Sequence, residues 1–181
     1  EEWNPILQDK DKKGLPRHYY GPLYWNYGFL PQTWENQDEE VDIGGGQMMI
    51  GDGDPVDIVE VGGHTIGSGE VIKVKALGAL ALLDQGELDW KIIVANVEDD
   101  ALADINSVEE LESYSPHMVS GIREWFRWYK TPGGKELNRF GFNESALSHA
   151  RTKSIIEETY EMYLNLKGQG GSPHGYWMGS P

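Results

Sequence analysis

Two long apolar segments restrict the folds open to this chain. Residues 70–83 and 88–97 are rich in Val, Leu, Ile and Ala, and a short polar turn at residues 84–87 separates them. From Trp90 onward the second segment alternates between two faces, which is the period-two pattern of a strand. Gly78 interrupts the first segment, so we expect either one bent strand or two strands that meet there.

Two shorter strand patterns precede these segments, at residues 23–30 and 56–61, and residues 36–51 are interpreted as a loop. Helix patterns are confined to the second half of the chain. Ser107 and Glu110 have the spacing of a capping box and predict a short helix.

Two longer helices are expected after this short one. Ser115, followed by proline, resembles a helix N-cap and predicts the start of the second helix. Asn143 is expected to cap a third helix that runs to about residue 166. Strands followed by helices are typical of an α+β fold, here mainly β.

A length of 181 residues fits one domain of ordinary size. We expect a single domain over residues 1–167 and a flexible tail rich in Gly, Ser and Pro over residues 168–181. Within that tail, the segment Tyr176-Trp177-Met178 could dock on another surface, which the sequence does not identify.

The charge balance narrows the classes of partner. The chain has 30 acidic and 15 basic side chains, a formal net charge of −15, which opposes general affinity for nucleic acids or anionic membranes. No apolar run approaches the roughly 18 residues that span a bilayer, so no membrane insertion is expected. The absence of cysteine excludes disulfides and zinc–thiolate sites. A protein this acidic would need metal cations between itself and an anionic substrate.

The central polar motif places Asp52, Asp54 and Asp57 within six residues, with Pro55 fixing a bend between them. Side chains two apart in an extended chain share a face, so these carboxylates can converge and bind Mg²⁺ or Mn²⁺. An acidic surface turn has the same composition and is the competing interpretation. An EF-hand is excluded, because Val56 stands where that loop needs an oxygen ligand.

A second acidic pair, Asp84 and Asp89, lies at the edges of the two apolar segments. Asp84 alone would be interpreted as a turn cap. Asp89 is harder to explain in this way, because Trp90 and Lys91 follow it directly on a strand.

With these motifs the chain resembles the soluble family I inorganic pyrophosphatases of the eukaryotic type, over roughly residues 4–166. The matching blocks are Asn-Tyr-Gly at 26–28, Pro-Gln-Thr-Trp-Glu at 31–35, Asp-x-Asp-Pro-x-Asp at 52–57, Val-Lys-Ala-Leu-Gly at 74–78, Leu-Leu-Asp at 82–84, Asp-Trp-Lys at 89–91, and Glu-Trp-Phe-Arg with Tyr-Lys at 124–130. Several ordered blocks are far more specific than one acidic motif.

The resemblance implies a small five-stranded, OB-like closed barrel with two or three flanking helices. It also implies hydrolysis of pyrophosphate to two phosphates with several Mg²⁺ ions, Mn²⁺ being an alternative. The metal ligands that it implies are Asp52, Asp57, Asp84 and Asp89, and Asp54 is implied as the carboxylate that helps to take the proton from the nucleophilic water. The implied phosphate-binding groups are Arg17, Tyr27, Tyr129 and Lys130, with Lys91 close by. Glu35 is implied as a further acidic residue of the site.

Taken singly, the phosphate-binding residues have simpler interpretations. Tyr27 and Tyr129 could be core aromatic residues, and Arg17 and Lys130 could be solvated surface charges. The resemblance further implies a cytoplasmic or mitochondrial-matrix protein that is a homodimer or a subunit of a larger complex.

The sequence also departs from the family pattern. The family has a basic residue and a glutamate on an early strand, before the segment matched here by residues 4–6, and this sequence shows no match for them. We therefore expect that the N-terminal strand is missing from the sequence or is supplied by another chain. The alternatives to an ordinary enzyme are one chain of a split enzyme and a non-catalytic structural subunit. A nucleic-acid-binding barrel is opposed by the charge.

Overall fold

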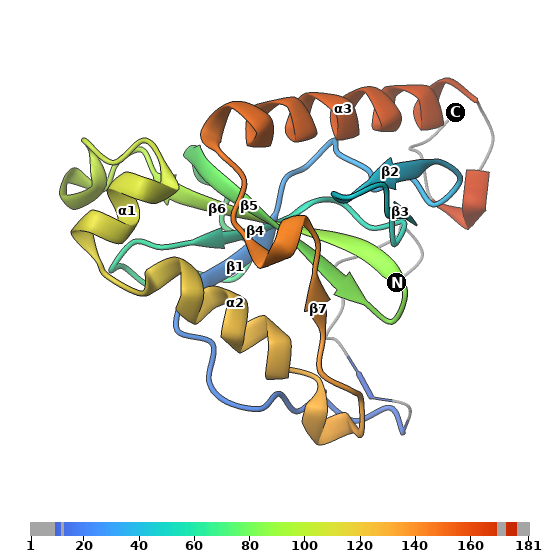
Figure 1. The fold of residues 1–181 in the computed structure, drawn as a ribbon, viewed down its shortest axis with the longest axis horizontal. Coiled ribbons are helices and arrows are strands. Elements are labelled where there is room, and N and C mark those ends of the chain that lie inside the picture. Colours follow the sequence, from blue (N-terminus) through green and yellow to red (C-terminus); the bar gives the residue numbers. More distant parts are fainter. Residues whose placement is uncertain (1–9, 12, 170–172, 177–181) are drawn as a thin grey trace.

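The computed structural model describes residues 10–11, 13–169 and 173–176 (Figure 1). In this part of the chain the strands lie at Asn26–Phe29 (β1), Glu40–Asp42 (β2), Met48–Ile50 (β3), Asp57–Glu60 (β4), Val74–Asp84 (β5), Glu87–Asn96 (β6) and Arg139–Phe140 (β7). The α-helices lie at Val108–Tyr114 (α1), Met118–Trp128 (α2) and His149–Gly168 (α3), and 3₁₀ turns lie at Asp100–Leu102 (η1), Thr131–Gly133 (η2), Phe142–Glu144 (η3) and Pro173–Gly175 (η4). The predicted α+β class, mainly β, is confirmed.

The main sheet has the strand order β1-β4-β6-β5-β7. Strands β4 and β6 are parallel, and the other neighbours are antiparallel. Strands β1 and β7 are the two ends of this order, and among the described residues no pairing joins them. The predicted closed barrel is therefore not confirmed.

The two long apolar segments form the strands β5 and β6, as predicted, although β5 begins at Val74 and not at residue 70. The two strands pair as an antiparallel hairpin. The register shifts between Ala76 and Gly78, which confirms the bend expected at the glycine. At the other end of the hairpin, Leu82 lies opposite Asp89. Since side chains two apart on a strand share a face, Asp84 and Asp89 lie on the same face of the sheet.

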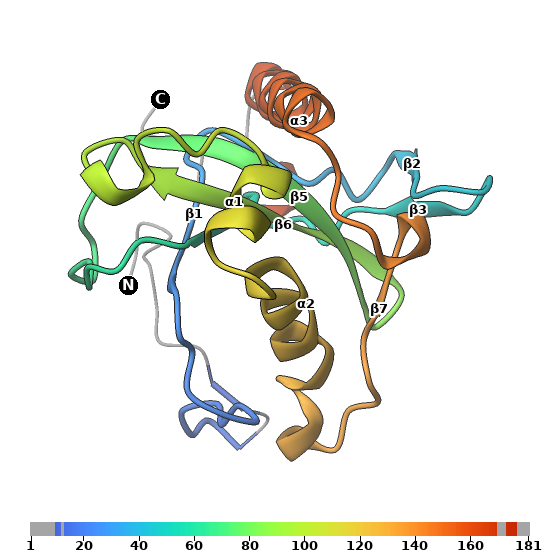
Figure 2. The ribbon, with the colours of Figure 1, turned by 60° about the vertical axis from the view of Figure 1, so that its left-hand side comes forward.

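Helices pack against both faces of the sheet (Figures 1 and 2). Apolar side chains cover both faces. On one face α1 and α2 pack against β4, β5 and β6, in a cluster that includes Val59, Leu80, Leu82, Ile93, Leu111, Ile122 and Phe126. On the other face α3 packs through Ile155 in a cluster that includes Ile58, Ala79, Ala81 and Ile92. Leu82 belongs to the first cluster, and Asp84 and Asp89 lie on the same face of the sheet as Leu82. The two aspartates therefore lie on the face that α1 and α2 cover, which is called the α2 face below.

The predicted start of α2 at Ser115 is wrong. The helix begins at Met118, after His117 in a left-handed conformation without a side-chain cap. The carboxylate of Glu112, on α1, instead accepts hydrogen bonds from the backbone N–H groups of His117 and Val119, at 2.7 and 2.6 Å. A residue of the preceding helix therefore satisfies the donors that the predicted cap would have served.

The start of α1 is confirmed, since Ser107 accepts a hydrogen bond from the backbone N–H of Glu110. The start of α3 is wrong: the helix begins at His149 and is capped by Ser148, whereas Asn143 lies in the left-handed region inside η3. The loop predicted over residues 36–51 contains the β2–β3 hairpin, whose three-residue strands are too short to show a period.

The predicted tail is described only in part. The helix α3 extends to Gly168, and Tyr176 contacts the loop that precedes β4. Trp177 and the matched segment at residues 4–6 lie outside the described residues, and a single domain over residues 1–167 stays a prediction. None of the helices in the described ranges is long and apolar enough to cross a bilayer.

Replacing Gly78 with Ala should destabilise the fold. A Cβ atom at this position would lie 2.3 Å from Cγ1 of Val108 and 2.7 Å from the backbone carbonyl oxygen of Leu147. Overpacking of this kind typically lowers the free energy of unfolding by about 2 kcal/mol. Urea unfolding monitored by circular dichroism measures this loss. The control is Gly63→Ala, because a Cβ atom on Gly63 meets nothing within 4 Å. Equal stability of both variants would contradict the packing argument.

Candidate active site

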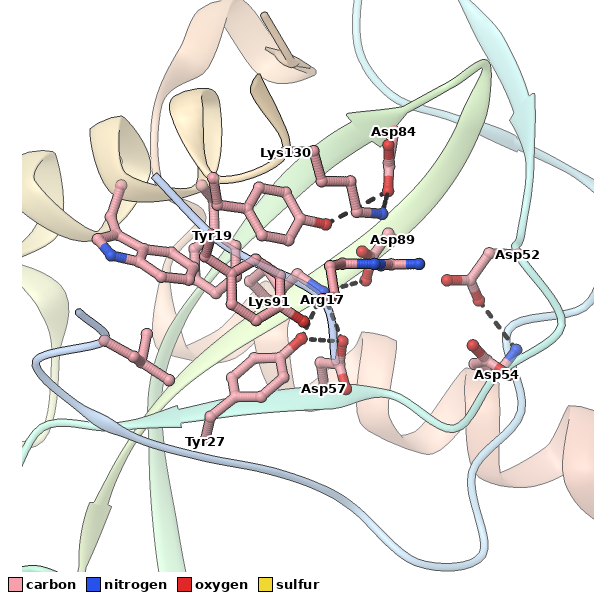
Figure 3. A pocket seen from close by; sticks show the side chains of 14 residues that line it. Arg17, Tyr19, Tyr27, Asp52, Asp54, Asp57, Asp84, Asp89, Lys91 and Lys130 are labelled. Carbon is pink, nitrogen blue, oxygen red and sulfur yellow. Dashed lines mark hydrogen bonds and ion pairs between the residues drawn. The ribbon is translucent and has the colours of Figure 1, made fainter. Parts of the chain in front are cut away.

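The candidate site is a cavity of about 240 Å³ between the α2 face of the sheet, the end of α2 and the segment before β1 (Figure 3). Five carboxylates and three cationic side chains line it, together with aromatic rings. The lining residues are Arg17, Tyr19, Leu23, Tyr27, Asp52, Asp54, Asp57, Asp84, Asp89, Lys91, Trp125, Phe126, Tyr129 and Lys130.

The carboxylates come from three places in the sequence. Asp52 and Asp54 lie in the loop between β3 and β4, and Asp57 is the first residue of β4. Asp84 ends β5, and Asp89 lies on β6. The pairing of β4 with β6 and of β5 with β6 brings these positions together. The five aspartates therefore line one cavity, and their roles as metal ligands and base stay predictions.

Lys91 is the buried centre of the cavity wall. It is 1% exposed, and its Nζ donates hydrogen bonds to Asp57 and Asp89 at 2.5 Å each and to the Tyr27 hydroxyl at 2.9 Å. The Tyr27 hydroxyl also donates to Asp57. Burial alone would lower the pKa of Lys91, but the charges of Asp89 and Asp57 raise it well above its usual value, so the ammonium stays charged.

A second cation lies beside Asp84, at the turn of the same hairpin. Lys130, just after α2, forms an ion pair with Asp84, and the Tyr129 hydroxyl donates to the same carboxylate oxygen at 3.3 Å. Burial raises the pKa of Tyr129, so the hydroxyl remains protonated and can donate. Tyr129 belongs to the first core cluster, as its simpler interpretation had it, and also lines the cavity. Lys130 is paired with Asp84 and is only 16% exposed, so its simpler interpretation as a solvated charge is wrong.

The carboxylates of the β3–β4 loop ionise less readily than free aspartate. Burial, and then the charge of Asp89, raise the pKa of Asp52 to about 7. Loss of hydration, and then the charge of Asp57, raise the pKa of Asp54. Burial is also the largest cause of the raised pKa of Asp89. The negative charge of the cavity is thus incompletely balanced by its lysines and arginine.

Glu35 does not line this cavity. It is 3% exposed, and both of its carboxylate oxygens accept from the backbone N–H of Trp90 at 3.1 Å. Burial raises its pKa, as do the charges of Asp89 and Asp52, so Glu35 lies behind these two aspartates. Its predicted place near the acidic site is consistent with this position, but it does not face the cavity.

Tyr19 is a cavity residue that the sequence did not indicate. Its ring stacks on Tyr129, with centroids 5.6 Å apart and planes at 19°, and lies 5.8 Å from the ring of Trp125. Leu23, Trp125 and Phe126 also line the cavity. Trp125 and Phe126 lie in the matched block at residues 124–127, but their helical spacing is also that of ordinary core residues, so the sequence did not assign them to the site.

The oxygen donors suit a hard divalent cation, and the uncompensated carboxylates would be stabilised by one. Among the described residues, no three acidic or histidine side chains form a ready-made metal cage. Lys91 and Lys130 bind the oxygens of Asp57, Asp89 and Asp84 instead.

The sequence matches the inorganic pyrophosphatase family over residues 13–164. The chain belongs to this family. It is 44% identical over 168 residues to the chloroplastic soluble inorganic pyrophosphatase 1 of Chlamydomonas reinhardtii. The aligned region is 92% of this chain and 58% of that protein. The chain spans about half of the length of the curated relatives that it matches.

Solved structures of this family have the same fold. The type I inorganic pyrophosphatase of Toxoplasma gondii superposes with a TM-score of 0.84 at 44% identity, over 90% of this chain and 69% of that one. An N-terminally truncated vacuolar soluble pyrophosphatase of Trypanosoma cruzi, solved in complex with PPi, superposes with a TM-score of 0.85 at 38% identity, over 93% of this chain and 62% of that one.

Proposed function

We propose that this protein hydrolyses inorganic pyrophosphate to two phosphate ions in a reaction that depends on Mg²⁺. The observation that carries the proposal is the single cavity in which five aspartates face Arg17, Lys91 and Lys130. Membership of the inorganic pyrophosphatase family supports it, as does the T. cruzi relative that was solved with PPi.

The metal ligands in this proposal are Asp52, Asp57, Asp84 and Asp89, holding several Mg²⁺ ions, with Mn²⁺ as an alternative. When bound, such ions would neutralise charge on the phosphates and lower the pKa of water in the site. Their binding would compete with Lys91 and Lys130 for the carboxylate oxygens and release these ammonium groups to the phosphates.

Asp54 is the proposed proton acceptor. A water oxygen forms the new P–O bond, the bridging P–O bond breaks, and Asp54 takes the proton of the water. The raised pKa of Asp54 makes it a stronger base than ordinary aspartate at neutral pH. Arg17, Lys130 and the hydroxyls of Tyr27 and Tyr129 would donate to the phosphate oxygens and stabilise the charge on the leaving phosphate.

The proposal extends to partners and compartment. Pyrophosphate is the small-molecule partner, and the charge of −15 opposes nucleic acid as an alternative. We propose a homodimer or a subunit of a larger complex, in the cytoplasm or the mitochondrial matrix. A strand that joined β1 to β7 would close the sheet into the OB-like barrel of the prediction.

Phosphate release from pyrophosphate tests the proposal directly. The protein with Mg²⁺ should release two phosphates per pyrophosphate, and addition of EDTA should abolish the release. Absence of turnover in a correctly folded protein would favour the structural-subunit alternative. Turnover that appears only when a second chain is added would indicate a split enzyme.

A further inference from the structure

The loop that carries Asp52 and Asp54 is held from two directions. On one side it bonds to the backbone of residues 35 and 36: Gly51 N–H donates to Asn36, Gly53 N–H donates to Glu35, and Glu35 N–H donates to Asp54, each at 2.9 Å. On the other side it meets Tyr176, the residue that follows the C-terminal turn η4.

Tyr176, the residue after η4, makes the contact from this second side. Its hydroxyl donates a hydrogen bond of 2.7 Å to the carbonyl oxygen of Gly53. A Cβ atom on Gly53 would lie 2.7 Å from the Tyr176 oxygen, and Gly53 has a φ of +88°, so only glycine fits this position without strain.

The peptide group between Gly53 and Asp54 is fixed at both of its polar atoms. The carbonyl oxygen of this group accepts from Tyr176, and its N–H, which belongs to Asp54, donates to the Asp52 carboxylate at 2.9 Å (Figure 3 shows the second bond). Because a peptide group is planar, a rotation that breaks the first bond also moves the N–H that orients Asp52.

The turn itself is anchored. The ring nitrogens of His174 lie 2.8 Å from the side-chain amide of Gln37 and 3.0 Å from the carboxylate of Asp38. The His174 ring also lies 5.4 Å from the ring of Trp34. Contacts with residues 34–38 therefore hold Tyr176 against the acidic loop.

We propose that Tyr176 is a positioning residue for Asp52 and Asp54, acting through the Gly53–Asp54 peptide group. This inference rests on the proposed function, in which Asp52 binds a divalent cation and Asp54 accepts a proton. The hydrogen bond from Tyr176 then raises the affinity of the site for the cation, and Tyr176 contacts neither the cation nor the substrate.

Replacing Tyr176 with Phe removes the hydroxyl and leaves the ring. We expect Mn²⁺, used as a paramagnetic probe without substrate, to bind about three- to tenfold more weakly, which is the effect of losing one hydrogen bond. The Mg²⁺ concentration for half-maximal hydrolysis should rise by a similar factor, while kcat at saturating Mg²⁺ changes less. His174→Ala should shift both quantities in the same direction by a smaller factor.

Tyr114→Phe is the matched control, because Tyr114 is exposed on α1 and lies outside the cavity. Unchanged Mn²⁺ affinity in Tyr176→Phe would overturn the inference, even if its thermal stability fell, since that would be a structural effect alone. The direct measurement of Mn²⁺ binding separates the positioning role of Tyr176 from the proposed hydrolysis of pyrophosphate. If the unaltered protein hydrolysed no pyrophosphate, the proposed function would fail, and Mn²⁺ binding would still test Tyr176.

Discussion

Asp54→Asn is expected to reduce the turnover of pyrophosphate by about two to three orders of magnitude. The amide has nearly the shape of the carboxylate but cannot accept the proton of the attacking water. The backbone N–H and C=O of residue 54 hold the loop through Asp52 and Glu35, and the substitution leaves both groups in place. The loss should therefore appear in kcat and not in folding. A steady-state assay at saturating Mg²⁺ measures it.

Asp104→Asn is the control for this variant, because the same chemical change then occurs on the exposed turn after η1, outside the cavity. It should retain the full rate. Equal rates in the protein and in Asp54→Asn would show that another group accepts the proton, and the assignment of Asp54 would be wrong. Circular dichroism of both variants confirms that the fold is kept.

The acidic half of the site was predictable because local sequence fixes it. Asp52, Asp54 and Asp57 lie within one bend, and a tight hairpin brings Asp84 and Asp89 to one face of the sheet. In the bend and in the hairpin, the short sequence separation brings the aspartates together, independently of the contacts with more distant segments. The two long strands were predictable for the same reason, since a long run of Val, Leu, Ile and Ala is a local property of the sequence.

Other parts of the site depend on contacts between distant segments. Tyr19 reaches the cavity only because the segment before β1 stacks on Tyr129, and Tyr176 reaches Gly53 across 123 residues of sequence. The predicted start of α2 failed because a side chain from another element, Glu112 of α1, serves as its cap. Lys91, predicted only to lie near the phosphates, is the buried counter-ion of two aspartates, which its strand pattern could not show.

Lys91→Met should be the most destabilising of the substitutions considered. It leaves Asp57 and Asp89 beside each other without their shared cation, and Asp89 is only 6% exposed. Removing one partner of a buried ion pair typically lowers the free energy of unfolding by about 3 to 5 kcal/mol. Urea unfolding without divalent cations measures the loss. Lys153→Met is the control, because Lys153 is 68% exposed and its ion pair with Glu157 at 3.9 Å should contribute less than about 0.5 kcal/mol.

A second substitution separates loss of charge balance from loss of packing. In Lys91→Met/Asp89→Asn the more deeply buried of the two uncompensated carboxylates is gone, and Asp57, with a side chain that is 27% exposed, is the one that remains. About half or more of the lost stability should therefore return. If packing of the Lys91 stem were the cause, the double variant would be no more stable than Lys91→Met. Mg²⁺ gives an independent readout: the oxygens freed by removing Lys91 should bind the cation, so Mg²⁺ should raise the melting temperature of Lys91→Met more than that of the unaltered protein. No additional stabilisation by Mg²⁺ would show that these carboxylates do not bind the ion, and the metal assignment of Asp57 and Asp89 would be wrong.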